Sequence, residues 1–274
     1  MAYLKGSLGI NPWRDIPLLR QILHSTVISH TQLFQFMSLG HYETRRDVFN
    51  WRLRRLVEHG MVKRHLISSV CADHLYTITN RGGLCLERHG DCYLHVSPFV
   101  QNEDKVEPLH LLHYLELNEI HLALVRTRLW SNWIPESRLR SLATQKASPY
   151  VKAYDAIVEL TLEGQGLRIA LEYERTQKNA REYAEIRETI EKERNVSVVL
   201  YLLPSSSLLV NVAQHFRGSE FPILFGLVDE FKQALLETPV SENGGIRTQT
   251  LHDALMQPQK SSSLRRLHVV LTPS

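Results

Sequence analysis

The spacing of the apolar residues changes near Pro149, and this change restricts the fold more than any other feature. Before it, Ile16, Leu19 and Leu23 recur at the spacing of an amphipathic helix. After it, residues 156–162 and 196–203 form apolar runs of strand length. The sequence therefore predicts an α+β or α/β protein. A length of 274 residues favours two domains over one or three.

Three helices followed by a hairpin are predicted in the first part of the chain. The helices cover residues 11–27, 31–38 and 44–59, and the hairpin follows at residues 61–79. Four residues mark the helix ends, namely Pro12, Gly40, Thr44 and Gly60. This order of elements resembles a winged helix-turn-helix, which we expect to occupy residues 1–100.

Positive charge is concentrated in the same part of the chain. Residues 1–100 contain 12 Lys and Arg against 7 Asp and Glu, whereas the rest of the chain is slightly acidic. The third helix has an apolar face and a polar, basic face. A basic helix fits the major groove, where Arg pairs with guanine, Asn pairs with adenine, and flanking cations neutralise phosphates. The expected contacts to double-stranded DNA are Arg45, Arg46, Asn50, Arg54 and Arg55 on the helix, and Lys63, Arg64 and His65 at the base of the wing.

A second domain is expected at residues 109–236, after a polar linker at residues 101–108. A long amphipathic helix starts it, followed by a hairpin that turns at Gly164 and Gly166. A charged helix at residues 178–194, two further strands and two further helices come next. This order predicts a mixed sheet flanked by helices. Residues 237–274 lose periodicity and are expected to form a flexible tail.

Three carboxylates are expected to meet where two strands of this sheet lie side by side. Asp155 begins one strand, and Glu172 and Glu174 share one face of the next. Carboxylates in this arrangement bind Mg²⁺ and can activate water, so all three are candidate metal ligands and catalytic residues. The alternative is that Glu172 and Glu174 form ordinary ion pairs with Arg168, Arg175 or Lys152, and that Asp155 is a turn residue.

The carboxylates also resemble those of the PD-(D/E)xK nuclease superfamily, which has a restriction-endonuclease-like fold. The resemblance implies that Asp155, Glu172 and Glu174 are the motif positions. Two positions depart from that motif, because Tyr154 replaces its proline and Glu174 replaces its lysine. We expect Lys178 to be the displaced catalytic cation, with Arg187 as a second candidate.

A more specific resemblance covers most of residues 14–216. A basic winged helix, a helix containing histidines, and Leu-Glu-Tyr-Glu-Arg-Thr before a charged helix are similar to the replication-relaxation family of plasmids and mobile elements. The helix contains His110, His113, Asn118 and His121, and the positions that match the family are Asp155, Glu172, Glu174, Arg175 and Thr176. The resemblance implies a DNA-binding protein of plasmid replication, relaxation or mobilisation, with other replication or mobilisation proteins as partners. Two alternatives stay open: an active Mg²⁺-dependent endonuclease or nickase, and an adaptor whose winged helix binds protein.

Cysteine content and hydropathy give the remaining expectations. Cys85, His89, Cys92 and His95 have no spacing that matches a zinc finger, so a metal-free role is favoured. Three cysteines are too few for a disulfide framework, which indicates a cytoplasmic protein. No apolar run reaches the roughly 18 residues of a membrane span, so no membrane partner is expected. Winged helices that bind two-fold sites often pair, which makes a homodimer an expectation.

Overall fold

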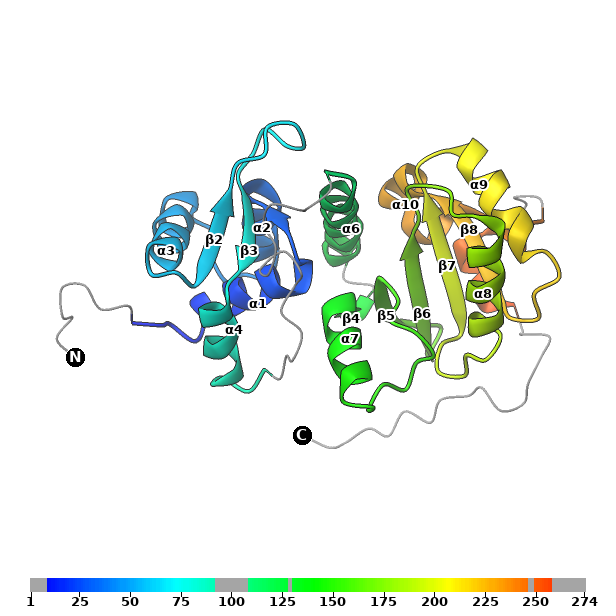
Figure 1. The fold of residues 1–274 in the computed structure, drawn as a ribbon, viewed down its shortest axis with the longest axis horizontal. Coiled ribbons are helices and arrows are strands. Elements are labelled where there is room, and N and C mark those ends of the chain that lie inside the picture. The colour runs from blue at the N-terminus through cyan, green and yellow to red at the C-terminus, as the bar shows by residue number, and fades with distance from the viewer. Residues whose placement is uncertain (1–8, 92–107, 128–129, 246–248, 258–274) are drawn as a thin grey trace. The chain divides into compact units, whose positions relative to one another are not determined.

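The computed structural model describes residues 9–91, 108–127, 130–245 and 249–257 (Figure 1). The chain divides into two compact units, unit 1 at Met1–Leu122 and unit 2 at Ala123–Ser274. This division lies inside one helix, α6 (Pro108–Thr127), later in the chain than the linker expected at residues 101–108. Of the helices in the described residues, none combines the length and the apolar character that crossing a membrane requires.

Unit 1 combines helices with a small antiparallel sheet. The sheet has three strands in the order β1-β3-β2. Its strands are β1 (Ile28–Ser29), β2 (Val62–His65) and β3 (Leu75–Ile78). Its helices, before α6, are α1 (Asp15–Ser25), α2 (His30–Leu39), α3 (Arg46–Glu58) and α4 (Asn80–Glu87). The three predicted helices and the predicted hairpin are therefore present in the expected order.

The boundaries of these helices follow from local hydrogen bonds. Ser29 caps α2, since its hydroxyl accepts from the Gln32 backbone N–H while the Gln32 side chain accepts from the Ser29 N–H. Gly60 follows α3 with a φ of +65°, a conformation that glycine adopts without strain. Thr44 is not the cap of α3, because the residue before the helix is Arg45, and its side chain makes no capping bond.

The first part of α6 belongs to unit 1 through buried polar contacts. The Asn118 side chain donates to the Val27 carbonyl at 2.8 Å, and the Gln32 side chain donates to the Leu115 carbonyl at 2.8 Å. His121 packs against Phe36 with ring centroids 4.8 Å apart, and burial lowers the pKa of His121 to about 3. Asn118 and His121 thus hold α6 against the rest of unit 1.

Unit 2 is a mixed sheet of seven strands with helices on both faces. The strand order is β10-β9-β8-β7-β6-β5-β4, in which β6, β7 and β8 are parallel and the other pairs are antiparallel. The strands are β4 (Trp130–Pro135), β5 (Ala156–Leu162), β6 (Gln165–Tyr173), β7 (Val198–Leu203), β8 (Ile223–Leu227), β9 (Pro239–Glu242) and β10 (Gln249–Thr250). The helices, after α6, are α7 (Glu136–Thr144), α8 (Ala180–Ile190), α9 (Ser206–Ala213), α10 (Val228–Ala234) and α11 (Leu251–Met256). Short 3₁₀ turns follow α9 at Gln214–Phe216 and α10 at Leu235–Glu237.

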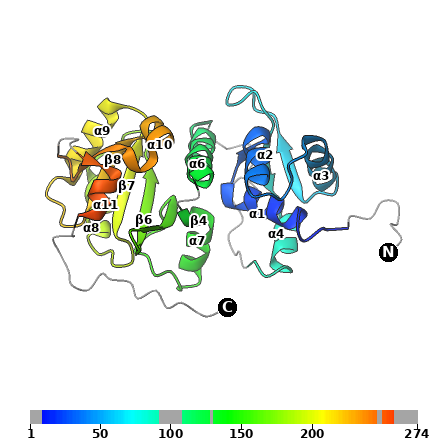
Figure 2. The ribbon, with the colours of Figure 1, turned by 180° about the vertical axis from the view of Figure 1, so that it is seen from behind.

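The core of unit 2 explains this arrangement. All six residues of β7 are buried, as expected for a central strand covered on both sides. Figures 1 and 2 show α8 on one face of the sheet and α11 on the other. Tyr183 and Ile190 of α8 pack onto the sheet beside Tyr201, Phe216 and other apolar residues of one core cluster.

The prediction of a flexible tail from residue 237 is wrong for most of the segment that the structure describes. Strand β9 pairs with β8, and its residue Val240 is fully buried. Helix α11 then buries Leu251, whose backbone N–H donates to the Thr238 carbonyl at 2.8 Å. Sheet pairing and burial therefore order a segment with no periodicity of its own. Residues 258–274 lie outside the described residues.

Candidate functional site

Helix α3 presents a charged face opposite a buried apolar one. Phe49, Leu53 and Leu56 lie at helical spacing and are at most 2% exposed. The same spacing leaves Arg46, Asn50 and Arg54 exposed on the other side. The core of unit 1 thus fixes which side chains of α3 are available to a partner.

Several arginines on α3 or directly before it make contacts near the protein surface. Arg45 pairs with Asp47 at 2.7 Å and Arg54 with Glu58 at 3.7 Å, but at least 60% of each of these four side chains is exposed. Arg46 lies over the Phe34 ring at 5.3 Å and Arg55 over the Trp51 ring at 4.7 Å. Water and salt screen exposed pairs of this kind, so the guanidinium groups of Arg45 and Arg54 can exchange their contacts for phosphates or bases.

Arg52 is the arginine of α3 that faces inward, and the sequence interpretation assigned it no role. Its guanidinium group lies 2.9 Å from the Asp15 carboxylate and 3.9 Å from that of Glu43. Asp15 is buried, so this pair joins α3 to the start of α1. Arg52 and Asp15 are 37 residues apart in the sequence, so no local sequence pattern predicts that they pair.

The basic residues of the hairpin lie in β2. Arg64 is exposed and pairs in register with Tyr76 of β3, while Lys63 and His65 are half-buried. Successive residues of a strand point to opposite faces, so Lys63 and Arg64 serve different surfaces. The ring of His65 is hydrogen-bonded to Thr77 at 2.9 Å, and burial lowers the pKa of His65, with Lys63 contributing.

The three predicted carboxylates lie on one face of the sheet in unit 2. The pairing of Ala156 with Leu171 places Asp155 opposite Glu172 across β5 and β6. The Tyr173 backbone N–H donates to Asp155 Oδ2 at 2.7 Å, and Glu174 follows β6 two residues after Glu172. The strands therefore bring together the residues that the sequence pattern paired.

Two lysines compensate these carboxylates. Lys152 Nζ lies 2.7 Å from Glu172 Oε1, and Lys178 is paired with Glu174. Lys178 was the predicted cation, whereas Lys152 appeared only in the ion-pair alternative. Arg187 does not contact these acids, because its side chain binds Glu191 and the carbonyls of Arg217 and Gly218. Arg168 is likewise not a partner of Glu172 or Glu174, since it pairs with Glu159 at 2.8 Å.

Burial controls the protonation of this cluster. It raises the pKa of Glu172 to about 7 and also raises the pKa of Glu174, with the Asp155 charge adding to both shifts and the lysines opposing them. Burial is the largest single influence on Lys152 and would lower its pKa, but the charge and hydrogen bond of Glu172, together with the charges of Asp155 and Glu174, outweigh it and raise the pKa. The Tyr201 hydroxyl beside the cluster has a strongly raised pKa, again through burial and the neighbouring acids.

The raised pKa of Glu172 predicts a pH-dependent stability. Between about pH 4.5 and 7, folded Glu172 holds a proton that the unfolded chain releases. The stabilisation that this proton provides is complete below the pKa of Glu172 in the unfolded chain. It is lost as the pH rises through 7, which lowers the free energy of unfolding by at most about 3 kcal/mol. In Glu172→Gln, urea unfolding measured from pH 4 to 8 should show a flatter stability curve. Glu188→Gln, on the exposed face of α8, should leave the curve unchanged, and an unchanged curve in Glu172→Gln would contradict the assignment.

These residues do not fit a magnesium site. Lys152 and Lys178 already supply the positive charge that a divalent ion would bring to Glu172 and Glu174. In the part of the chain that the structure describes, no three His, Cys, Asp or Glu side chains are grouped so that they could hold a metal ion. The contacts of Glu172 and Glu174 are charge-neutralising ion pairs within unit 2.

The Cys and His residues near the end of α4 include two that the structure describes. Cys85 is buried, and His89 Nδ1 donates to the Cys85 carbonyl at 2.8 Å. That bond closes the last turn of the helix and gives both residues a structural part. Cys92 and His95 lie outside the described residues.

Comparisons with known proteins complete the description of these sites. No protein-family model, no curated protein and no solved structure matches this chain.

Proposed function

We propose that unit 1 is a winged helix-turn-helix domain that binds double-stranded DNA through α3. The exposed row of Arg46, Asn50 and Arg54, opposite a fully packed apolar face, carries this proposal. The succession of α1, β1, α2, α3 and the β2–β3 hairpin supports it, as does the basic balance of residues 1–100. Arg45, Arg55, Lys63 and Arg64 then contribute phosphate contacts beside the groove.

We further propose that unit 2 has a restriction-endonuclease-like fold that acts as a scaffold without cleaving DNA. The antiparallel order β4-β5-β6, followed by α8 and a parallel β7, supports the fold. The lysine pairs of Glu172 and Glu174 support the lack of catalysis. A role in the replication or mobilisation of a mobile element rests on the resemblance to the replication-relaxation family, and would take place in the cytoplasm.

The salt dependence of DNA affinity tests the first proposal. We expect the affinity of the full chain for a labelled duplex, measured by fluorescence anisotropy, to fall steeply between 50 and 200 mM salt. Each phosphate contact contributes about 0.9 to the slope of log affinity against log salt. Lys63→Ala should lower this slope by roughly one and weaken all duplexes alike.

A matched control is Lys192→Ala, which removes an exposed lysine from unit 2 and should leave the slope unchanged. An affinity that does not respond to salt would contradict DNA binding and favour the alternative that unit 1 binds another protein.

Plasmid cleavage tests the second proposal. Purified protein incubated with supercoiled plasmid and Mg²⁺ or Mn²⁺ should leave the plasmid intact, because Lys152 and Lys178 already neutralise Glu172 and Glu174, two of the three carboxylates. Nicking that disappears in Asp155→Ala would instead establish an active endonuclease and overturn the scaffold proposal.

A further inference from the structure

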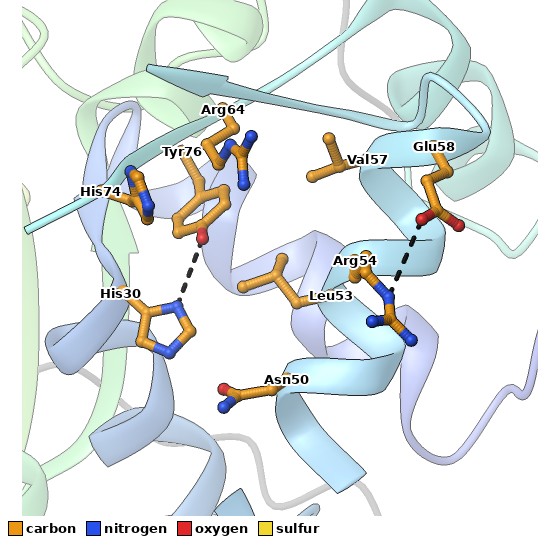
Figure 3. Close-up of a pocket in the computed structure, with 9 residues that line it drawn as sticks. All are labelled: His30, Asn50, Leu53, Arg54, Val57, Glu58, Arg64, His74 and Tyr76. Atoms are coloured by element: carbon orange, nitrogen blue, oxygen red, sulfur yellow. Dashed lines mark hydrogen bonds and ion pairs between the residues drawn. The ribbon is translucent and has the colours of Figure 1, made fainter. Parts of the chain in front are cut away.

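A pocket of about 370 Å³ lies in unit 1 between α3 and the β2–β3 hairpin (Figure 3). The first residue of α2, His30, closes one side of it. This volume lies within the range of small-molecule sites in proteins. The residues that line it come from four elements and the loop before β3: His30, Asn50, Leu53, Arg54, Val57, Glu58, Arg64, His74 and Tyr76.

The polar part of the lining consists mainly of hydrogen-bond donors. Within the described residues, no carboxylate pairs with Arg64, whose guanidinium group extends toward the pocket in Figure 3. His74 Nδ1 is buried and has no hydrogen-bond partner among those residues. A buried polar atom without a partner costs free energy, and a movement of the His74 ring that brings this nitrogen to a bound ligand would recover it.

The hydroxyl and imidazole groups nearby also favour an acceptor. His30 Nδ1 lies 3.2 Å from the Tyr76 hydroxyl. Burial lowers the pKa of His30, against the opposing charge of Asp73, and burial raises the pKa of Tyr76. The phenol therefore keeps its proton. Glu58 is the acid that lines the pocket, and it is paired with Arg54 at 3.7 Å. The lining as a whole can neutralise an added negative charge.

An apolar wall faces these donors. Leu53 is 2% exposed and projects from α3 toward the pocket, and Val57 lies one turn further along the same helix. Together with the Tyr76 ring they offer a dry surface to a flat or apolar body. A bare inorganic anion would leave this surface without a contact, whereas an organic anion would cover it.

We propose that this pocket binds a small organic anion, with a carboxylate or phosphate group at Arg64 and His74 and an apolar body against Leu53 and Val57. Asn50 and Arg54 line the pocket and also belong to the proposed DNA-binding face. Bound ligand therefore competes with DNA for these two side chains. This competition rests on the proposed function, whereas the ligand site itself does not.

Direct calorimetry on the full chain tests the site. Two probes represent the two sources of such an anion, salicylate for aromatic carboxylates and thymidine 5′-monophosphate for nucleotides. We expect at least one of them to bind with a dissociation constant below about 1 mM, and the tighter of the two identifies the source. Benzyl alcohol, which lacks the charge, and inorganic phosphate, which lacks the apolar body, should each bind at least tenfold more weakly. Failure of both organic anions, or equal binding of either control compound, would overturn the proposal.

Variants locate the site and separate it from the DNA proposal. Arg64→Gln should weaken binding of the preferred probe at least tenfold, and Val57→Trp should abolish it by filling the pocket without removing a charge. Arg81→Gln removes an exposed arginine from α4 of the same unit and should have no effect. Full affinity in both pocket variants would overturn the assignment. Saturating ligand should weaken duplex binding at least tenfold, and an unchanged duplex affinity would overturn the competition. A chain that binds the probe but no DNA would refute the proposed function and leave the ligand site standing.

Discussion

Replacing Glu193 by alanine should lower the free energy of unfolding of unit 2 by about 4 kcal/mol. The Glu193 side chain is fully buried, and its two oxygens accept four hydrogen bonds. The donors are the backbone N–H groups of Val151, Arg194 and Asn195 and the hydroxyl of Tyr154, at 2.8 to 3.1 Å. Alanine leaves the buried Tyr154 hydroxyl and three partly buried backbone N–H groups without this acceptor. A buried donor without a partner costs about 1–3 kcal/mol and a partly buried one costs less, so the sum stays near 4 kcal/mol. Urea unfolding followed by circular dichroism measures the change.

Two further variants make this prediction specific. Tyr154→Phe removes one of the four donors and leaves the carboxylate with three, so we expect a loss of only about 1 kcal/mol. Glu188→Ala, on the exposed face of α8, makes the same substitution without burial and should stay within about 0.5 kcal/mol of the parent chain. A Glu193→Ala variant no less stable than Glu188→Ala would contradict the role assigned to Glu193.

Glu193 lies outside the carboxylate cluster, but its hydrogen bonds help to position the segment that carries Lys152 and Asp155. Glu193 accepts from the Val151 backbone N–H, and the Asn195 side chain donates to the Pro149 carbonyl. These bonds hold the segment that carries Lys152 and Asp155 to the loop after α8. The ion pair of Lys152 with Glu172 therefore depends on contacts that cross about 40 residues of sequence.

Local sequence patterns predicted two elements of unit 2, the β5–β6 hairpin and strand β7. The glycines after residue 162 predicted a hairpin, and the structure joins β5 to β6 by the two-residue turn Glu163 and Gly164, both with positive φ. The apolar run at residues 196–203 corresponds to the buried strand β7. In both cases the signal lies within ten residues, where turn chemistry and side-chain period act directly.

Elements that depend on distant partners were not predictable in this way. Strand β4 has mostly exposed or half-buried residues and forms by pairing with β5 at the edge of the sheet. Strand β9 has four residues and is recognisable only once β8 lies beside it. At the carboxylate cluster, residue type and spacing indicated the three acids. The pairing of Lys152 with Glu172 depends instead on the three-dimensional position of the loop that carries Lys152.

The largest effect on DNA binding is expected when four arginines on α3 or directly before it are neutralised together. The variant replaces Arg45, Arg46, Arg54 and Arg55 by glutamine and should bind a preferred duplex at least 100-fold more weakly. A bidentate contact from Arg to guanine contributes about 1–3 kcal/mol, and each lost phosphate contact also reduces the salt dependence. The buried face of α3 does not contain these side chains, so the fold of unit 1 should persist. Anisotropy at two salt concentrations, with circular dichroism to verify folding, provides the measurement.

A charge-matched control separates specific contacts from the general effect of removing four positive charges. The control replaces four other exposed arginines, also by glutamine. They are Arg81 on α4, Arg88 just after α4, Arg138 on α7 and Arg181 on α8. Both variants lower the net charge equally, so any weakening caused by long-range attraction alone would appear in both and would fade at high salt. Only the loss of contacts made by α3 itself would remain at high salt in the first variant. Equal weakening of the two would show that α3 is not the surface that reads DNA, and undiminished affinity in the first would end the proposal.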